Sequence, residues 1–396
     1  MFERFPCPSE TFALREIECL RRQGVHIVVF CAQRCAGAVR HGSLEIIAAP
    51  RGFGSAARGV LRDLLARRWM RLGRLAALLA RLAFRSVRQA GGLLRDLPAV
   101  GAFAGALEAA GIRHVHGYWL GWPGRMAAAV SAVTGASMSL AGHARDIFVP
   151  APGLDVLVGR GAFVAVCTEQ GRRHLAGLLG GKQAAKLRLV RHGLLPEEME
   201  SPWPDSAGAG PEVLAVGRLV PKKGFDVLLR AFGRVRAARQ RARLTLVGDG
   251  PEDGPLRRLA SDLGLAGCTT FAGRRTHADT LATMRSARVL VVPSVIATDG
   301  DRDGTPNVIL EAFACGTPVV ASALAGIAEA VEPGGSGVLV PPGDPAALAN
   351  AIARVCDAGP LREGLVRGGR AVLAERFDGM RNAARLAALL GRAERQ

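Results

Sequence analysis

The sequence predicts an α/β protein made of two doubly wound units, each a parallel sheet with helices on both faces. Three observations predict this fold class. The chain has 396 residues, more than one ordinary core can use, so two domains are the default. Short, nearly continuous apolar segments alternate with helical segments in both halves, as in parallel sheets with crossover helices. A stretch rich in proline and glycine, Leu195 to Pro211, separates the halves.

Composition narrows the class of function. A formal net charge of +18 predicts an acidic partner, such as nucleic acid, an anionic lipid or a phosphorylated ligand. Aromatic residues make up only 5% of the chain and no zinc-finger or RNP motif is present, which argues against nucleic acid. Eight cysteines at irregular spacings, without a CxxC pair, predict free thiols in a reducing cytoplasm. The N-terminus has no apolar segment of the kind found in signal peptides.

The first domain is predicted over residues 1–195. It opens with a helix over Glu10–Arg22, with Ser9 as its N-cap. Strands are expected at 25–30, 44–49, 114–118, 137–141, 163–167 and 187–190, and helices at 124–134 and 170–179. In such folds ligands bind at the carboxyl ends of the strands. The polar residues that fall there are Tyr118, His143, Arg145, Asp146 and Glu169.

Histidines lie both on and directly after these strands. His143 directly follows a strand and has Asp146 nearby, so we expect it to be functional more often than an average histidine. His114 and His116 lie on the 114–118 strand, and we expect them to face opposite sides of the sheet.

A basic amphipathic helical insert is predicted at about 58–90. Its apolar face holds Leu61, Leu65, Leu72 and Leu79, and the other side holds Arg67, Arg71, Arg74, Arg81, Arg85 and Arg88. Such a helix either packs on its own domain or lies on an anionic membrane, where each cation adds on the order of 1 kcal/mol. The two possibilities are compatible and both stay open.

After a linker at 196–211, the second domain is predicted over 212–375. Strands are expected at 212–216, 243–247, 269–272, 289–293 and 319–321, and helices begin near 224 and surround 281–287. The first strand runs into GRLVPKKG, where Gly217 permits close backbone approach. Arg218 and Lys223 flank a short loop before a helix, which predicts a clamp for a diphosphate. Lys222 is interpreted as their solvated neighbour.

The stretch DGDRDGTPNVILEAFACGTPVVA, residues 299–321, is the central candidate site. Its loop turns at residues 304–306 and enters a helix, so free N–H groups and a partial positive charge can face an anion. Asp303 lies in the loop and Glu311, eight positions later, lies on the helix. A calcium loop of the EF-hand type is rejected, because its closing glutamate would fall on Leu310.

Three strings carry a resemblance to a known family: VGRLVPKKGFDVLLRAF, LVGDGP and DGTPNVILEAFACGTPVVAS. With the two α/β halves they resemble the retaining family-four glycosyltransferases of the GT-B fold, over nearly the whole chain. SETFALREIECL, GHARDIF and DGDRDGTPNVILEA are similar to bacterial exopolysaccharide enzymes of the colanic-acid type. The resemblance implies two Rossmann-like domains that face a central cleft, and a terminal helix, 376–396, that crosses back to the first domain.

The resemblance also implies roles for the two carboxylates and for His143, which we assign as catalytic. Glu311 corresponds to the family's residue for the ribose hydroxyls of the nucleotide. Asp303 corresponds to the residue that reaches the donor sugar, where the family usually has glutamate. His143 falls where the family places a histidine near the reacting end of the donor sugar.

The donor-binding residues follow from the same resemblance. Backbone N–H groups of the loop would hold sugar or phosphate oxygens, and the loop comprises Gly304, Thr305, Pro306 and Asn307. Arg218 and Lys223, after Gly217, correspond to the cations that neutralise the diphosphate leaving group. Fixed cations and helix N–H groups stabilise charge that develops on the phosphate in the transition state. Neither a metal ion nor another cofactor is expected.

These features predict a retaining glycosyltransferase that moves a hexose from a nucleotide sugar to a glycan, or to an acceptor linked to polyprenyl diphosphate. The protein is expected in the cytoplasm, peripheral on the inner face of the membrane, without a nucleic-acid partner. One departure from the family is that only MFERFP precedes its first matching segment, so either the true start lies upstream or the first strand is expected to be missing. That departure and Asp303 favour an alternative, an inactive homologue that serves as a membrane-associated assembly partner. A nucleotide-sugar epimerase is disfavoured by the EAFACGTPVV string.

Overall fold

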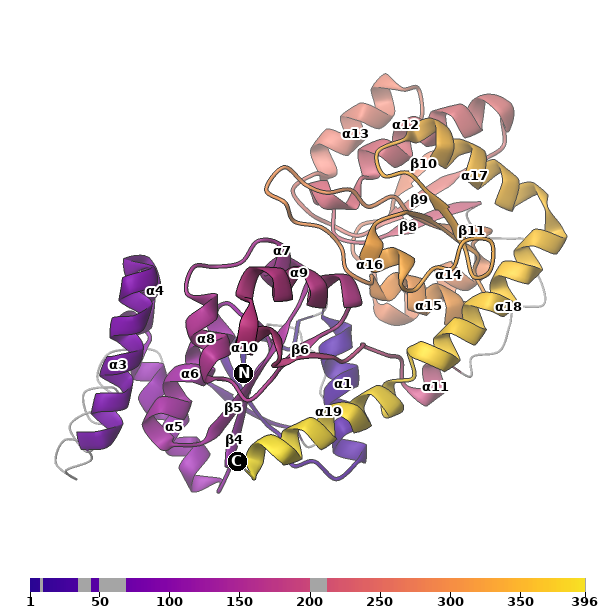
Figure 1. Ribbon diagram of the computed structural model, residues 1–396. Helices are drawn as coiled ribbons and strands as arrows, with labels where there is room; N and C mark the ends of the chain where they lie inside the picture. The colour runs from indigo at the N-terminus through magenta and orange to yellow at the C-terminus, as the bar shows by residue number, and fades with distance from the viewer. Residues whose placement is uncertain (8–9, 35–43, 50–68, 200–211, 396) are drawn as a thin grey trace. The chain divides into compact units, whose positions relative to one another are not determined.

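The computed structural model describes the chain except for residues 8–9, 35–43, 50–68, 200–211 and 396 (Figure 1). The chain divides into two compact units. Unit 1 comprises Met1–Val190 and Met380–Gln396, and unit 2 comprises Arg191–Gly379. Ser9, residues 58–68 of the insert and residues 200–211 of the linker lie outside the described residues.

Unit 1 is built on parallel strands in two runs, β1–β2–β3 and β4–β5–β6–β7. Tyr118 N donates to Met1 O at 3.1 Å, which places the start of β1 beside the end of β4 and joins the two runs. The strands are β1 (Phe2–Phe5), β2 (Val28–Arg34), β3 (Glu45–Ala48), β4 (His114–Gly117), β5 (Ser137–Gly142), β6 (Val164–Val166) and β7 (Leu187–Leu189).

The expectation of a missing first strand is wrong. β1 pairs in parallel with β2, with Phe2 opposite Cys31 and Phe5 opposite Arg34. Both phenylalanines are buried, whereas the two charged residues between them are exposed. Because half of this four-residue strand is charged, it shows no apolar run, and that is why the sequence pattern hides it.

The expectation for the two histidines of β4 is also wrong. His114 Nε2 and His116 Nδ1 both lie 2.7 Å from the hydroxyl of Ser139 on β5. Residues two apart on a strand share a face, so the two rings lie on the same side of the sheet. Burial lowers the pKa of His114 to about 4, as expected for a neutral imidazole held between serine hydroxyls.

Helices cover both faces of the unit 1 sheet. They are α1 (Thr11–Arg22), α3 (Trp69–Arg85), α4 (Val87–Arg95), α5 (Leu97–Ala109), α6 (Trp122–Thr134), α7 (Ala144–Phe148), α8 (Leu154–Arg160), α9 (Glu169–Leu179), α10 (Gly181–Ala184) and α19 (Gly379–Glu394). Residues 126–133 of α6 are all buried, so this helix lies at the centre of the core. α3 and α4 form the outer edge of unit 1, beyond α5 and α6 (Figure 1).

The described part of the basic insert is two helices rather than one. α3 ends at Arg85, and Ser86 begins α4 by accepting a hydrogen bond from Gln89 N at 3.3 Å. Leu78 and Leu82 of α3 are buried in the core of unit 1, as the packing interpretation predicts. None of the helices in the described ranges is long and apolar enough to cross a membrane.

Unit 2 is one six-stranded parallel sheet in the order β10-β9-β8-β11-β12-β13. Its strands are β8 (Val213–Val216), β9 (Leu244–Val247), β10 (Thr269–Phe271), β11 (Val289–Val292), β12 (Val319–Ser322) and β13 (Val338–Val340). Its helices are α11 (Pro196–Met199), η1 (Pro221–Lys223), α12 (Phe225–Ala238), α13 (Asp253–Asp262), α14 (His277–Ser286), α15 (Asn307–Cys315), α16 (Ala325–Ala328), α17 (Pro345–Asp357) and α18 (Gly359–Arg376). The strand order reverses between β8 and β11, and open α/β sheets bind ligands beyond such a point.

Candidate active site

Two loops that follow β8 and β11 carry the predicted donor residues, and the backbone locks them together. Gly224, with φ at 62°, ends the turn η1, and a Cβ there would lie 2.0 Å from the carbonyl oxygen of Pro293. Val295 N also donates to the carbonyl of Lys222 at 2.8 Å. Only glycine fits such a crossing, so the spacing between the two loops is fixed.

A third loop, after β9, packs against the backbone of the loop that follows β8. A Cβ on Gly248 would lie 1.9 Å from the carbonyl oxygen of Gly217, and one on Gly250 would lie 2.3 Å from that of Leu219. Leu219 N in turn donates to the carbonyl of Asp249 at 2.7 Å. The LVGDGP string is therefore explained by backbone contact with the GRLV loop, which it holds in place.

The centre of this arrangement is a buried ion pair. Lys223 Nζ lies 2.7 Å from Asp303 Oδ2, which also accepts a hydrogen bond from the hydroxyl of Ser294 at 2.6 Å. Lys222 Nζ lies 3.1 Å from Asp301 and 3.7 Å from Asp303. Burial raises the pKa of Asp303, but the charges of Lys223 and Lys222, with the hydrogen bonds from Lys223 and Ser294, outweigh it and hold the pKa below its ordinary value.

These contacts change two interpretations of the sequence. Lys222 is not a solvated neighbour, because its side chain is only 11% exposed and pairs with two aspartates. Lys223 lies over Gly217, whose Cβ position is 3.5 Å from the lysine stem, and its charge is already paired with Asp303. Arg218 is exposed and stands outside this cluster.

The loop from Gly304 to Asn307 leads into α15. A Cβ on Gly326 would lie 2.8 Å from Gly304 Cα, and the hydroxyl of Thr305 donates to the carbonyl of Gly326 at 3.0 Å. Pro306 is the N-cap of the helix, which begins at Asn307. The first N–H groups of a helix have no partner within it and form its positive end, which suits an anionic ligand.

Glu311 is the one charged residue of α15, and its side chain is only 7% exposed. Its carboxylate lies 4.0 Å from Nδ1 of His277, whose Nε2 lies 3.6 Å from Glu198. His277 opens α14 and Glu198 lies on α11, so His277 links these two helices to α15. The sequence gives no signal for His277 or Glu198, because only tertiary packing brings them to Glu311.

His143 belongs to unit 1 and lies between β5 and α7. Its ring centroid is 5.2 Å from Phe12, 5.3 Å from Tyr118 and 5.0 Å from Trp119, so aromatic rings surround it. Tyr118 directly follows β4, close to the predicted strand end, and Trp119 comes next in the chain. Unit 2 holds the other predicted site residues, Lys223, Asp303 and Glu311 together on three adjoining segments.

Asp146 lies one turn beyond His143 and accepts hydrogen bonds from the backbone N–H groups of Leu120, at 3.1 Å, and His143. Burial raises its pKa to about 6, although those two hydrogen bonds and the charge of Arg145 oppose the shift. A carboxyl group that titrates near neutral pH beside a candidate catalytic histidine is typical of functional sites.

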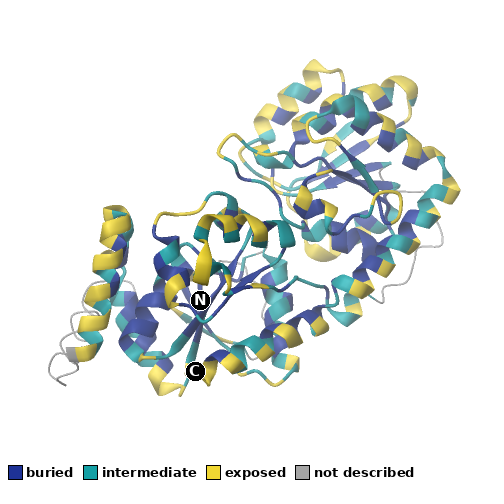
Figure 2. Ribbon diagram, viewed as in Figure 1, coloured by how far each residue is buried: buried dark blue, intermediate teal, exposed yellow. Residues whose placement is uncertain are grey.

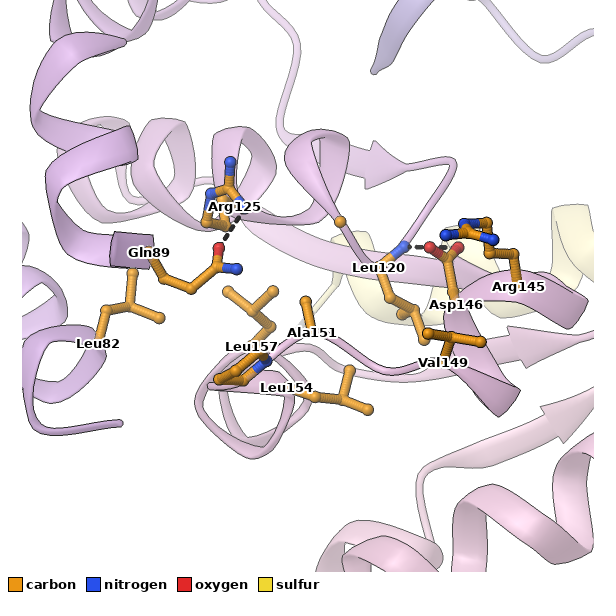
Figure 3. Close-up of a pocket in the computed structure, with 12 residues that line it drawn as sticks. Leu82, Gln89, Leu120, Arg125, Arg145, Asp146, Val149, Ala151, Leu154 and Leu157 are labelled. Carbon is orange, nitrogen blue, oxygen red and sulfur yellow. Dashed lines mark hydrogen bonds between the residues drawn. The ribbon is translucent and has the colours of Figure 1, made fainter. Parts of the chain in front are cut away.

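A cavity of about 100 Å³ begins at Asp146 (Figure 3). Leucine side chains form its walls, and Arg125 donates a hydrogen bond to Gln89 on the side away from Asp146. Burial lowers the pKa of the Arg125 guanidinium. The cavity therefore combines an apolar wall with a carboxyl group, an amide and a guanidinium, the groups that bind hydroxyls.

The comparisons with known proteins agree with this geometry. Residues 210–358 match the sequence model of the family described as "Glycosyl transferases group 1". The amylovoran biosynthesis glycosyltransferase AmsK of Erwinia amylovora is 32% identical over 175 residues, which cover 44% of this chain and 43% of that protein. The putative colanic acid biosynthesis glycosyltransferase WcaL of Salmonella typhimurium is 37% identical over 142 residues, covering 36% and 35%.

One solved structure extends the likeness to the whole chain. Anabaena HepE in complex with UDP-glucose superposes with a TM-score of 0.74, covers 99% of this chain and 98% of its own, and is 18% identical. The fold of this chain is therefore GT-B, as the resemblance implied. The curated relatives are matched over about two fifths of their length. The family model matches residues of unit 2 and confirms the family resemblance there.

Proposed function

We propose that this chain, whose residues 210–358 belong to the group 1 glycosyltransferases, transfers a hexose from a nucleoside diphosphate sugar during exopolysaccharide synthesis. The observation that carries the proposal is the buried Glu311 on α15, a helix whose start follows directly on the loop that holds the Lys223–Asp303 pair. The Glu311 carboxylate suits the ribose hydroxyls, and the first N–H groups of the helix suit phosphate oxygens. The Lys223 ammonium group suits the leaving diphosphate.

The reaction breaks the bond between the anomeric carbon and the phosphate oxygen, and the nucleoside diphosphate leaves with the electron pair. The acceptor oxygen bonds to the anomeric carbon from the same face, and its proton passes to the departing phosphate. Retention of configuration follows, and the step requires no metal ion. Lys223 and the N-terminus of α15 stabilise negative charge that grows on the phosphate, so they lower the barrier to leaving-group departure.

Unit 2 would bind the donor sugar near Asp303, and unit 1 would bind the acceptor. In unit 1, His143 is proposed as a catalytic residue, with aromatic rings around it to exclude water. HepE was solved with UDP-glucose, and AmsK and WcaL are named for the synthesis of amylovoran and colanic acid. These names support a hexose donor on a nucleoside diphosphate and a growing cell-surface glycan as acceptor.

The acceptor is proposed to be carried on a polyprenyl diphosphate at the inner face of the cytoplasmic membrane. The enzyme would reach it as a peripheral protein. Support comes from the outer edge of unit 1, where α3 and α4 expose apolar and basic side chains together. Such helices lie in the interface of anionic membranes.

Donor binding tests the enzyme assignment. Purified protein is titrated with UDP-glucose, GDP-mannose and other nucleotide sugars while its thermal stability is followed, because a ligand that binds only the native state raises stability. One nucleotide sugar should stabilise the wild type, whereas Glu311→Gln and Lys223→Ala should lose that response. Arg257→Ala, a charge change on the surface helix α13, is the matched control and should respond fully.

One observation favours the alternative of an inactive assembly partner. Asp303 already forms ion pairs with two lysines. The same titration decides between the two. If no nucleotide sugar binds saturably to folded wild-type protein, the enzyme proposal fails and the partner alternative replaces it.

A further inference from the structure

The outer side of α3 and α4 is exposed and apolar. Met70 is 83% exposed, Phe84 87%, Val87 79% and Leu94 52%. They are four of the seven large hydrophobic side chains that are exposed among the described residues. Figure 2 shows exposed residues along the outer side of these helices and buried ones toward the unit 1 core. An apolar surface of this kind in one place indicates an interaction site rather than scattered exposure.

The residues form a stripe because of their spacing. Met70, Gly73, Ala77, Ala80 and Phe84 recur every three or four positions on α3, so they share one face, and all are exposed. Val87 and Leu94 of α4 are seven positions apart, so they share one face of that helix, and both are exposed. We call these seven residues the outer stripe. Leu78 and Leu82 bind α3 to the core from the other side, so the outer stripe is not needed for that packing.

The arginines of α3 separate into two groups. Arg71 pairs with Glu108 of α5 at 2.6 Å, and Arg85 with Asp155 of α8 at 2.6 Å, so both attach the helix to unit 1. Arg74 and Arg81 border the outer stripe and have no carboxylate partner among the described residues. They lie close enough to Arg160, at the end of α8, that their charges, added to its burial, lower its pKa.

Arg160 lines an open depression of about 470 Å³ at the amino ends of β5, β6 and β7, together with Ser131 and Lys186. Arg160 donates to the hydroxyl of Ser131 at 3.4 Å, and Arg74 Nη1 lies 3.5 Å from the Cβ position of Gly135, which caps α6. We call this depression, with Arg74, Arg81 and Arg160, the basic notch.

Among the described residues, the basic notch holds more positive charge than its surroundings balance. The C-terminal end of α6 carries a partial charge of about −0.5, which offsets only half of one guanidinium. The ammonium group of Lys186 already donates to the carbonyls of Val158, Gly159 and Gly161 at 2.6–3.2 Å, so it holds the end of α8. Three guanidinium groups therefore remain close together and would gain from a shared anion.

We propose that the basic notch binds the phosphate of an anionic membrane lipid while the outer stripe enters the same leaflet. The proposal rests on the peripheral membrane association given under "Proposed function" and assigns it to named residues. The neighbouring outer stripe decides the source of the phosphate. A free phosphate ion needs no apolar surface beside it, whereas a lipid presents its headgroup and its acyl chains side by side.

Vesicle flotation tests the proposal with the full chain. The wild type should float with vesicles of phosphatidylcholine mixed with phosphatidylglycerol, and much less with phosphatidylcholine alone. The loss of any one cation near the surface costs about fivefold in binding. Arg160→Gln should weaken binding to the mixed vesicles by more than this, and Arg74→Gln/Arg81→Gln by more than about 25-fold. Phe84→Ser/Val87→Ser should weaken flotation with comparable severity.

Arg88→Gln is the matched control, because it removes the same charge from exposed α4 outside the basic notch. If Arg160→Gln binds no worse than Arg88→Gln, general attraction explains the binding and the notch is not a headgroup site. If inorganic phosphate stabilises the wild type but not Arg160→Gln, and flotation is unchanged, the notch binds a free phosphate and the lipid proposal is overturned.

Two further measurements keep the outcomes separate. Circular dichroism and urea unfolding of every variant show that a loss of flotation is not a loss of fold. Stabilisation by a nucleotide sugar, which depends on unit 2, should be the same in the wild type and all notch variants. Failure of donor binding in the wild type would thus refute the glycosyltransferase proposal. The flotation result would still test whether the basic notch and the outer stripe bind a membrane.

Discussion

Replacing Asp303 with asparagine should strengthen the binding of a nucleoside diphosphate and weaken the fold. Asparagine keeps the size of the side chain and can still accept the hydrogen bond from Ser294, now 2.6 Å long. It removes the charge that pairs with Lys223 at 2.7 Å and faces Lys222 at 3.7 Å. Two ammonium groups then share a single carboxylate, that of Asp301.

The size of the effect follows from the distances. A phosphate in contact with Lys223 would lie about 6 Å from the Asp303 carboxylate, and at an effective dielectric constant of about 20 their repulsion is roughly 3 kcal/mol before ionic screening. With half of that screened, removing the charge should tighten UDP binding about tenfold. Breaking a buried pair costs about 3–5 kcal/mol, and asparagine should fall at the lower end because it keeps the hydrogen bond from Ser294.

Isothermal titration of the wild type and of Asp303→Asn measures both parts. UDP should bind the variant about tenfold more tightly, whereas UDP-glucose should gain less, because Asp303 is proposed to contact the donor sugar as well. Asp301→Asn is the comparison, since Asp301 pairs with Lys222 at 3.1 Å rather than with Lys223, and it should change UDP affinity less. If Asp303→Asn stays folded and binds UDP more weakly than the wild type, Asp303 does not compete with the diphosphate for Lys223.

Other substitutions test separate parts of the structure. Glu311→Gln should lower UDP affinity about 30-fold, by roughly 2 kcal/mol, but leave the binding of inorganic pyrophosphate unchanged in the same titration. Gly250→Ala should lower the free energy of unfolding of unit 2 by about 2–3 kcal/mol in urea, whereas Gly267→Ala, with open space around it, should not. Asp146→Asn should raise stability by up to about 3 kcal/mol above pH 6, because the pKa of Asp146 is raised to about 6 and its charged form therefore costs stability there. That difference should shrink as the pH falls from 6 and vanish below the ordinary pKa of 3.8, and a stability gain that grows toward low pH would contradict it.

The sequence predicts the edge of the sheet at which the site lies, because alternation of strands and helices fixes a parallel sheet. Gly217, Lys223, Asp303 and Glu311 all fall beyond strand ends in unit 2, as expected. It cannot predict which lysine pairs with which aspartate. That choice depends on the backbone crossing at Gly224 and Pro293, a contact between residues far apart in the chain.

The other features that the sequence did not predict, β1 and the pairing of the insert's arginines, also have physical causes. β1 is hidden because two of its four residues are charged, and its stability comes from pairing with β2 rather than from an apolar pattern. The basic insert shows amphipathic spacing, but the spacing cannot tell that Arg71 and Arg85 pair with acidic residues of unit 1. Only the tertiary contacts separate these structural arginines from Arg74 and Arg81.

The pairing of Lys223 with Asp303 also has a consequence for catalysis. Two lysines only 11–17% exposed would repel each other without nearby carboxylates, so the aspartates hold them in place. We propose that the same pairing weakens the attraction of Lys223 for the bound donor and keeps it available for the leaving group, whose negative charge grows as the glycosyl bond breaks. An interaction that strengthens only in the transition state raises the rate without tightening substrate binding. Asp303→Asn should therefore bind UDP more tightly yet transfer sugar more slowly, with product release limiting the turnover number, and a variant that gains both affinity and rate would exclude this role.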